Sequence, residues 1–318
     1  MNILQPKSIT IGFNPIYGQE FFDTISMYDK YVDGYFFSAD HYIDGRKFNK
    51  SEIYEILRSC NTYNYRGNLL CNNFGEDTDI LEKIRIFKEI INLTSVTVLN
   101  PDIGKNIKEL FPDIEIHLSV RFWDWGRFKD TISLLPMIRN MGIDVINVSG
   151  AYHYNDFTFM NKIHELGMKV KFILEESCIV RKDINYSDLP GFETAVCRAN
   201  PFSTISCQFG MCERVIDIYP WMEFARVPIY KESPQCKYID IFKLSSRFRS
   251  IEYITLQLNY WTSTDRTRFL YLYYDRLDIR SDEKYNIFLE WIDDRSKCAG
   301  NCWNCRKCEK YYNIISNK

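Results

Sequence analysis

Short hydrophobic segments alternate with amphipathic segments along most of this chain, at intervals of about 30 residues. The hydrophobic segments are rich in β-branched and aromatic residues and are bounded by polar residues, which is typical of strands. They read as near-continuous apolar runs, as parallel strands buried on both faces do. The predicted strands cover residues 8–14, 33–38, 67–72, 94–99, 115–120, 144–149, 169–174 and 238–244.

Most predicted strands are followed by a segment whose apolar residues recur with helical spacing. These helices are predicted over residues 19–31, 51–63, 77–91, 105–110, 129–141, 157–166 and 251–261. Ser51 is the expected N-cap of the second one. Eight strands separated by helices predict an α/β fold of the (β/α)8 type, a TIM-like barrel over residues 8–262 in a domain 1–262. A doubly wound open sheet would also alternate in this way, but no GxGxxG or GxxxxGK[ST] phosphate loop supports one.

A helical, cysteine-rich extension is expected over residues 263–318, with helices over 266–280 and 282–292. Its last part holds four thiols spaced C-x3-C-x2-C-x2-C, which are Cys298, Cys302, Cys305 and Cys308. Such short loops strain a disulfide, and zinc sites usually combine two distant CxxC pairs. A single continuous run is closer to the ligation of a 4Fe-4S cluster. The tail therefore predicts a metal centre, with iron–sulphur favoured, zinc as the alternative, and free or redox-active thiols as the third reading.

A second group of cysteines falls in residues 175–237, a segment with little periodicity that follows the seventh predicted strand. Long loops after barrel strands lie at the carboxyl end of the barrel, where barrel enzymes build their active sites. We expect a metal site here, against the simpler reading that free cysteines pack as small apolar residues. The candidate ligands are Cys178, Cys197, Cys207, Cys212 and Cys236. By contrast, Cys60 and Cys71 are expected to pack in the core.

Charge and composition narrow the classes of partner. Lys and Arg number 40 against 42 Asp and Glu, a net charge of −2, so no basic excess signals nucleic-acid binding. A small molecule or a peptide is therefore a better substrate candidate than a large RNA. The N-terminal residues lack the pattern of a secretory signal, and no apolar run reaches the roughly 18 residues of a membrane span. Eleven cysteines in this context predict a reducing cytoplasm.

Several short motifs resemble those of collagenase-like proteins of peptidase family U-32. Residues 174–181 (LEESCIVR) resemble its N-E-x-C…R signature, and residues 242–247 (FKLSSR) its F-K-[IL]-x-G-R strand. Residues 221–230 (WMEFARVPIY) fall where that family has a Trp-to-Tyr segment, and Tyr35 and Gly45-Arg46 belong to segments similar to its second strand and the following Gly-Arg element. The similarity extends over roughly residues 8–262.

The resemblance implies a TIM-like barrel with a 4Fe-4S cluster on barrel cysteines. It also implies an oxygen-independent hydroxylation of ubiquinone precursors, tRNA or ribosomal RNA, with prephenate as the oxygen donor of some members. Cys178 matches the signature cysteine, Cys197 a second ligand and Cys236 a third. The family's next cysteine is absent here, so Cys207 or Cys212 would complete the set. A serine also replaces the glycine of the FKLSSR strand.

Charged residues after predicted strands are the candidate substrate ligands. Arg121 and Arg247 follow the fifth and eighth strands, and a guanidinium suits an anionic group. Glu176, with Glu175, reads either as a general base or as the partner of such an arginine.

The four histidines are weaker candidates. His117 is expected as a core residue whose side chain could point into the barrel, and His164 as a solvated helix residue. His153 and His41 have some claim as site residues because they follow strands.

These residues together predict an iron–sulphur-dependent barrel enzyme that carries out an oxygen-independent redox modification. The expected substrate is a small molecule, a peptide or, less favoured, an RNA base, and an electron-donor protein could serve as partner. One or two clusters are both compatible with the cysteines. A non-catalytic metal-binding adaptor and a peptidase are the alternatives, although no Ser-His-Asp or Cys-His arrangement can be identified from sequence.

Overall fold

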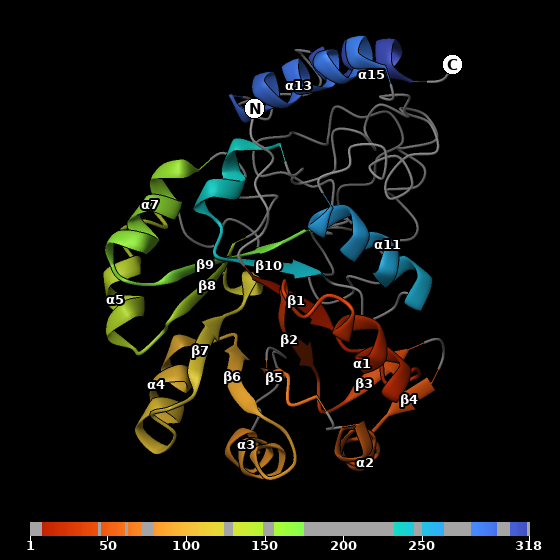
Figure 1. The fold of residues 1–318 in the computed structure, drawn as a ribbon. Helices are drawn as coiled ribbons and strands as arrows, with labels where there is room; N and C mark the ends of the chain where they lie inside the picture. The colour runs from red at the N-terminus through yellow and green to blue at the C-terminus, as the bar shows by residue number, and fades with distance from the viewer. Residues whose placement is uncertain are drawn as a thin grey trace, which may run out of the picture.

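Eight parallel strands close into a barrel in the order β1-β10-β9-β8-β7-β6-β5-β2 (Figure 1). The computed structural model describes residues 8–43, 46–60, 63–71, 79–123, 130–148, 156–174, 232–244, 250–263, 281–297 and 306–316. The barrel strands are β1 (Ile9–Gly12), β2 (Val32–Phe37), β5 (Arg66–Cys71), β6 (Leu93–Val98), β7 (Glu115–Leu118), β8 (Val145–Val148), β9 (Lys169–Ile173) and β10 (Ile241–Leu244). The predicted (β/α)8 fold and all eight predicted strands are confirmed.

The helices lie outside the barrel, and most of their ends differ from the predicted ones by a few residues (Figure 1). They are α1 (Gln19–Ser26), α2 (Lys50–Cys60), α3 (Ile80–Lys88), α4 (Pro101–Leu110), α5 (Leu135–Asn140), α7 (Phe157–Glu165) and α11 (Ile251–Thr262). The expected cap at Ser51 is wrong. Asn49 caps α2 instead, because its Oδ1 accepts from the Glu52 backbone N–H at 3.1 Å and its own N–H donates to the Glu52 carboxylate at 2.9 Å.

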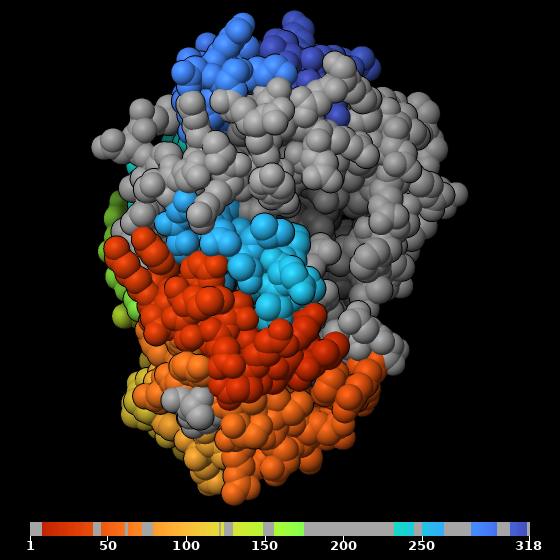
Figure 2. Space-filling view, turned by 45° about the vertical axis from the view of Figure 1, so that its right-hand side comes forward, coloured from red at the N-terminus to blue at the C-terminus, as the bar shows by residue number. Residues whose placement is uncertain are grey.

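The barrel closes between its first and last units. β1 pairs with β10 in parallel, and α11 packs beside α1, as the light-blue and red surfaces show in Figure 2. Tyr28, just after α1, donates its hydroxyl hydrogen to Asn259 Oδ1 at 3.0 Å. A short antiparallel hairpin, β3 (His41–Ile43) with β4 (Arg46–Phe48), follows β2 and was not predicted.

The outward face of the strands forms an apolar layer under the helices. Ile116, Leu118, Val170 and Phe172 are fully buried there, and so are the helix residues that cover the strands, such as Phe159. Burial of this layer is the main stabilising term of the barrel, since apolar area removed from water contributes roughly 25 cal/mol per Å². The stability of the fold thus depends mainly on the outward-facing side chains of the strands.

Register determines which residues face the barrel axis. Successive side chains of a strand point to opposite faces, and paired residues on neighbouring strands share a face. The pairs Ser95–Glu115, Thr97–His117 and Asn147–Lys171 place these side chains on the inner face. The sequence had suggested strands that are apolar on both faces. The inner face is instead largely polar.

Two helices of the extension pack against each other beyond the barrel. They are α13 (Asp282–Ser296) and α15 (Lys307–Ile315), and α13 also contacts the 3-10 helix η4 (Pro234–Tyr238) that leads to β10. Tyr285 of α13 donates its hydroxyl hydrogen to Glu232 at 3.2 Å. The helix predicted over 282–292 is confirmed, whereas α15 was not predicted and the helix expected over 266–280 lies outside the described residues.

None of the described helices combines the length and the apolar character that a bilayer crossing requires.

Candidate active site in the barrel interior

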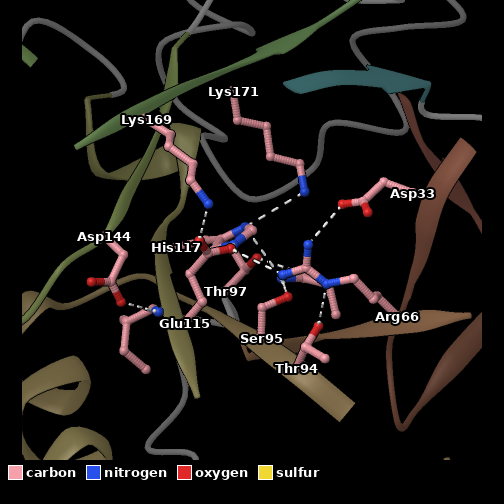
Figure 3. Close-up of polar contacts among 12 residues, drawn as sticks. Asp33, Arg66, Thr94, Ser95, Thr97, Glu115, His117, Asp144, Lys169 and Lys171 are labelled. Carbon is pink, nitrogen blue, oxygen red and sulfur yellow. Dashed lines mark hydrogen bonds and ion pairs between the residues drawn. The ribbon is translucent and has the colours of Figure 1, made fainter. Parts of the chain in front are cut away.

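Three inward-facing residues form a connected polar chain inside the barrel: Glu115 and His117 on β7 and Lys171 on β9 (Figure 3). The Glu115 carboxylate lies 2.9 Å from His117 Nε2, and His117 Nδ1 lies 3.5 Å from Lys171 Nζ. His117 is 2% exposed and Lys171 1% exposed. An amine, an imidazole and a carboxylate thus lie in sequence within a nearly dry environment.

Hydrogen bonds from Asn68 on β5 determine the tautomer of His117. Thr97 donates its hydroxyl hydrogen to Asn68 Oδ1 at 2.7 Å. The Asn68 amide nitrogen therefore faces Ser95 Oγ at 2.7 Å and His117 Nδ1 at 3.2 Å. Since an amide nitrogen only donates, Nδ1 is the acceptor and the ring proton lies on Nε2, where Glu115 accepts it.

Burial decides the charge of each member of this chain. Desolvation, reinforced by the charge of Lys171, lowers the pKa of His117 to about 4 although Glu115 acts in the other direction. Desolvation also lowers the pKa of Lys171 to about 7, against the charges of Glu115 and Asp33. Burial opposes the ionisation of Glu115, but His117 and Lys169 outweigh it and hold the pKa of Glu115 well below its usual range. Near neutral pH these three side chains therefore provide a carboxylate, a neutral imidazole and an amine that exchanges its proton easily.

An ionic layer surrounds Glu115 at the amino end of the barrel. Lys169 Nζ lies 2.6 Å from the Glu115 carboxylate, and Arg66 lies 3.0 Å from Asp33 and 3.9 Å from Glu115. All four side chains belong to the first two residues of their strands, so they meet at one end of the barrel (Figure 3). The pairing keeps Glu115 charged and oriented toward His117.

Two further inward-facing groups have unused hydrogen-bonding capacity. Asn147 on β8 donates from Nδ2 to the Leu118 carbonyl at 2.7 Å, but within the described part of the chain its buried Oδ1 has no hydrogen-bond partner. The same holds for Thr10 Oγ1 on β1 among the described residues. Asn147 is 1% and Thr10 7% exposed. Buried polar atoms normally have partners, so each of these two atoms is free to form a hydrogen bond with a bound polar molecule.

None of these residues except His117 was identified from sequence. A signal was nevertheless present, since Lys169 and Lys171 alternate with apolar residues in β9, as Glu115 and His117 do in β7. Charged residues two positions apart within a buried strand share a face and require each other or a ligand. The barrel register then brings the two strands' polar faces together.

Most of the predicted site residues lie outside the described residues, so their roles stay predictions. This holds for Glu176, Arg247, Cys178, Cys197, Cys207, Cys212, Cys298, Cys302 and Cys305, and also for His153. Arg121 lies in η1 (Val120–Phe122), three residues after β7 ends at Leu118, whereas the sequence predicted a strand that continues to residue 120. Its side chain, like that of His41, is outside the description.

The predictions for four individual residues can be checked. His117 is buried and faces the barrel interior, as expected, and Cys60 and Cys71 are buried core residues, also as expected. His164 is an exposed residue of α7, as predicted, and its Nε2 lies 2.8 Å from Asp240, so it bridges α7 to the start of β10.

The insertion contributes one described cysteine, Cys236 in η4. It is 5% exposed, and desolvation together with the charge of Glu232 raises the pKa of its thiol above the usual range. A thiolate at this position would need a nearby positive charge, such as that of a cationic side chain or a metal centre. Whether Cys236 meets the other insertion cysteines stays a prediction.

The tail contributes Cys308, the second residue of α15. The indole N–H of Trp291 on α13 donates to Cys308 Sγ at 3.3 Å. Tyr311 and Lys307 of α15 also contact Asp294 of α13, at 3.0 Å and 3.4 Å. The segment with the other three tail cysteines, residues 298–305, thus joins two helices that are held together on either side of it. Among the described residues alone, no group of three or more His, Cys, Asp or Glu side chains is arranged to hold a metal ion.

Comparisons with known proteins give no family. No protein-family model matches the chain, and no curated protein is significantly similar to it. Among solved structures, a chain of the tryptophan synthase α2β2 complex from Pyrococcus furiosus is similar at 10% identity and a TM-score of 0.46, covering 81% of this chain and 98% of that chain. The 7,8-dihydropteroate synthase from Vibrio fischeri ES114 is similar at 8% identity and a TM-score of 0.39, covering 81% and 94%. Likeness at this level carries no conclusion about function, and the barrel is defined by its own strand order.

Proposed function

We propose that this chain is a barrel enzyme that carries out an oxygen-independent redox modification and holds a metal centre on its cysteine tail. The observation that carries the proposal is the indole N–H of Trp291 directed at Cys308 Sγ. Cysteine sulphurs that ligate iron–sulphur clusters commonly accept such hydrogen bonds, which tune the reduction potential. A protonated thiol is a much weaker acceptor, so this contact fits a metal-bound sulphur.

The donor set fits the same reading. Cys298 comes two residues after α13 ends at Ser296, and Cys308 lies in the first turn of α15, so at most eleven consecutive residues carry all four cysteines between two helices that contact each other. Cys298, Cys302, Cys305 and Cys308 would hold the centre, and a 4Fe-4S cluster there would supply single electrons. Zinc in the same set would instead stabilise the extension without redox chemistry.

The resemblance to peptidase family U-32 adds a second centre to the proposal. Cys178, Cys197 and Cys236, with Cys207 or Cys212, would hold it, and Arg121 and Arg247 would bind an anionic group of a small-molecule or peptide substrate. Glu176 is the proposed base or arginine partner. The polar barrel interior supports an enzyme over a non-catalytic adaptor, because a purely structural barrel gains more stability from an apolar interior.

Metal analysis tests the proposal. The full chain is purified without oxygen and analysed for iron, sulphide and zinc, together with its absorption spectrum. About eight irons per chain support two 4Fe-4S clusters and about four support one. Zinc in stoichiometric amount without iron contradicts the redox proposal.

Matched variants assign a centre to the tail. Cys305→Ser is expected to remove one centre and leave the barrel folded, whereas Cys60→Ala, a buried cysteine of α2, leaves the metal content unchanged. Trp291→Phe is expected to retain the centre but to make its reduction potential more negative, since the N–H donor is lost. Trp261→Phe, a buried tryptophan of α11, is the control. Equal metal content in Cys305→Ser and the unmodified chain would overturn the tail assignment.

A further inference from the structure

The carboxylate, imidazole and amine that lie in sequence inside the barrel have no role in the proposed cysteine-bound metal centres. A nucleophile next to a base, with the base oriented by a third group, is the arrangement that activates covalent catalysts. Glu115 orients His117, and His117 Nδ1 faces Lys171 Nζ at 3.5 Å. Asn68 holds the imidazole with this nitrogen as an acceptor. The order of carboxylate, imidazole and amine is therefore one that activates the amine as a nucleophile.

Lys171 differs in its charged neighbours from Lys169, a structural lysine on the same strand. Lys169, two residues earlier, has its ammonium 2.6 Å from the Glu115 carboxylate, a direct ion pair at the barrel end. Lys171 is deeper, and within the described part of the chain its only polar contact is His117 at 3.5 Å. A fully buried lysine that makes no close ion pair contributes little to stability, because burial of its charge is unfavourable. The burial of Lys171 is better explained by a catalytic role than by a structural one.

We propose that the barrel interior is a second catalytic site, in which Lys171 attacks the carbonyl carbon of a small hydroxy aldehyde or hydroxy ketone and forms an imine. The two buried groups without partners among the described residues define the substrate class. Asn147 Oδ1, on the strand next to Lys171 and in register with it, accepts a hydrogen bond from a substrate hydroxyl. Thr10 Oγ1 can donate to the carbonyl oxygen.

The step balances without any oxidant or reductant. The nitrogen lone pair of the neutral Lys171 amine forms the C–N bond, and the carbonyl π electrons move to oxygen. His117 Nδ1 accepts one proton from the attacking nitrogen and returns it to the oxygen, which gives a carbinolamine. It then accepts the second proton of that nitrogen and delivers it to the hydroxyl, which leaves as water as the C=N bond forms. Glu115 stabilises the transient imidazolium through Nε2–H. Water reverses the reaction.

Reductive trapping tests the site in the full chain. The chain is incubated with glycolaldehyde and cyanoborohydride near pH 7, and labelled lysines are located by peptide mass spectrometry. We expect Lys171 to be labelled at least tenfold faster than exposed lysines such as Lys162 on α7. The labelling rate of Lys171 should increase with pH and be half-maximal near pH 7. Modification confined to exposed lysines, with Lys171 unlabelled, would overturn the proposal.

Variants distinguish a positioned amine from one that is merely buried. Lys171→Met abolishes the fast label, and the exposed control Lys162→Met leaves it unchanged. His117→Asn is expected to slow the labelling of Lys171 by about 10²-fold, the lower range for general acid–base catalysis. An unchanged rate and pH profile in a folded His117→Asn chain would contradict the role of His117. Because the rate at Lys171 is measured in the unmodified chain first, the test does not depend on any variant folding. Failure here also leaves the metal analysis of the tail unaffected.

Discussion

The outer and inner faces of the same eight strands differ sharply in chemistry. On β7, the outward Ile116 and Leu118 are fully buried apolar residues, while the inward Glu115 and His117 form a hydrogen-bonded pair. On β9, Val170 and Phe172 face the helices and Lys169 and Lys171 face the axis. Alternation within a strand thus separates the residues that stabilise the barrel from those that can carry out chemistry. Substitutions on the outer face should lower the free energy of unfolding most, whereas those on the inner face should change reactivity, with smaller or opposite effects on stability.

The largest effect is expected from the outer face. Phe172→Ala removes a fully buried ring from β9 and is expected to lower the free energy of unfolding by about 3–5 kcal/mol, because it loses burial and leaves a cavity. Chemical denaturation measures this change. A loss below about 1 kcal/mol would show that the outer layer is not the main stabilising layer.

On the inner face of the same strand, a substitution to an apolar residue should raise the free energy of unfolding instead of lowering it. Lys171→Met is expected to raise the free energy of unfolding near neutral pH by about 1–4 kcal/mol, since it replaces a buried amine by an apolar side chain of similar length. The pKa of Lys171 is lowered to about 7 by burial, so between pH 7 and the unfolded value of 10.5 the unfolded chain binds more protons. The stability of the unmodified chain therefore rises over this range.

The advantage of Lys171→Met should accordingly be largest below pH 7 and shrink as the pH approaches 10. Denaturation of both chains across this range measures the difference. A constant difference would mean that Lys171 is charged in the folded protein up to high pH.

Asn68→Ala should have a smaller effect, on both stability and chemistry. It leaves the Thr97 hydroxyl and His117 Nδ1 without their shared partner, which is expected to lower the free energy of unfolding by about 1–3 kcal/mol. Thr97→Val removes only one of these bonds and is the milder comparison, at about 1 kcal/mol. If Asn68→Ala left the reactivity of Lys171 unchanged, Asn68 would not determine the imidazole tautomer.

The smallest effect is expected outside the barrel wall. Asp156 caps α7, where its carboxylate accepts from the Phe159 N–H at 2.9 Å. Asp156→Ala is expected to lower the free energy of unfolding by about 1 kcal/mol. The pH dependence of stability between 7 and 10 should stay that of the unmodified chain, because the cap touches no inward-facing group. A changed pH dependence would show coupling between the helix layer and the interior.

The strands could be predicted because each is a short apolar run between polar residues, and eight such runs specify a barrel. The inner face could not, because a lysine such as Lys171 within an apolar run has no visible partner until β7 and β9 are placed two strands apart. Asn49 was missed as a cap because Ser51 also suits that position and only the hydrogen bonds to Glu52 distinguish them. α15 was missed because the cysteine motif, read as an irregular metal-binding run, continues into its first turn at Cys308.

Titration of Lys171 in the folded chain tests the central claim most directly. With ¹³C-labelled lysine, the side-chain signal of Lys171 is identified by its loss in Lys171→Met and followed by NMR as the pH is raised. A midpoint near 7 is expected, because burial outweighs the nearby carboxylates and leaves a large share of the amine neutral and nucleophilic near neutral pH. A midpoint near 10.5, the ordinary value of lysine, would contradict the account, since the inner face would then hold a charged structural lysine.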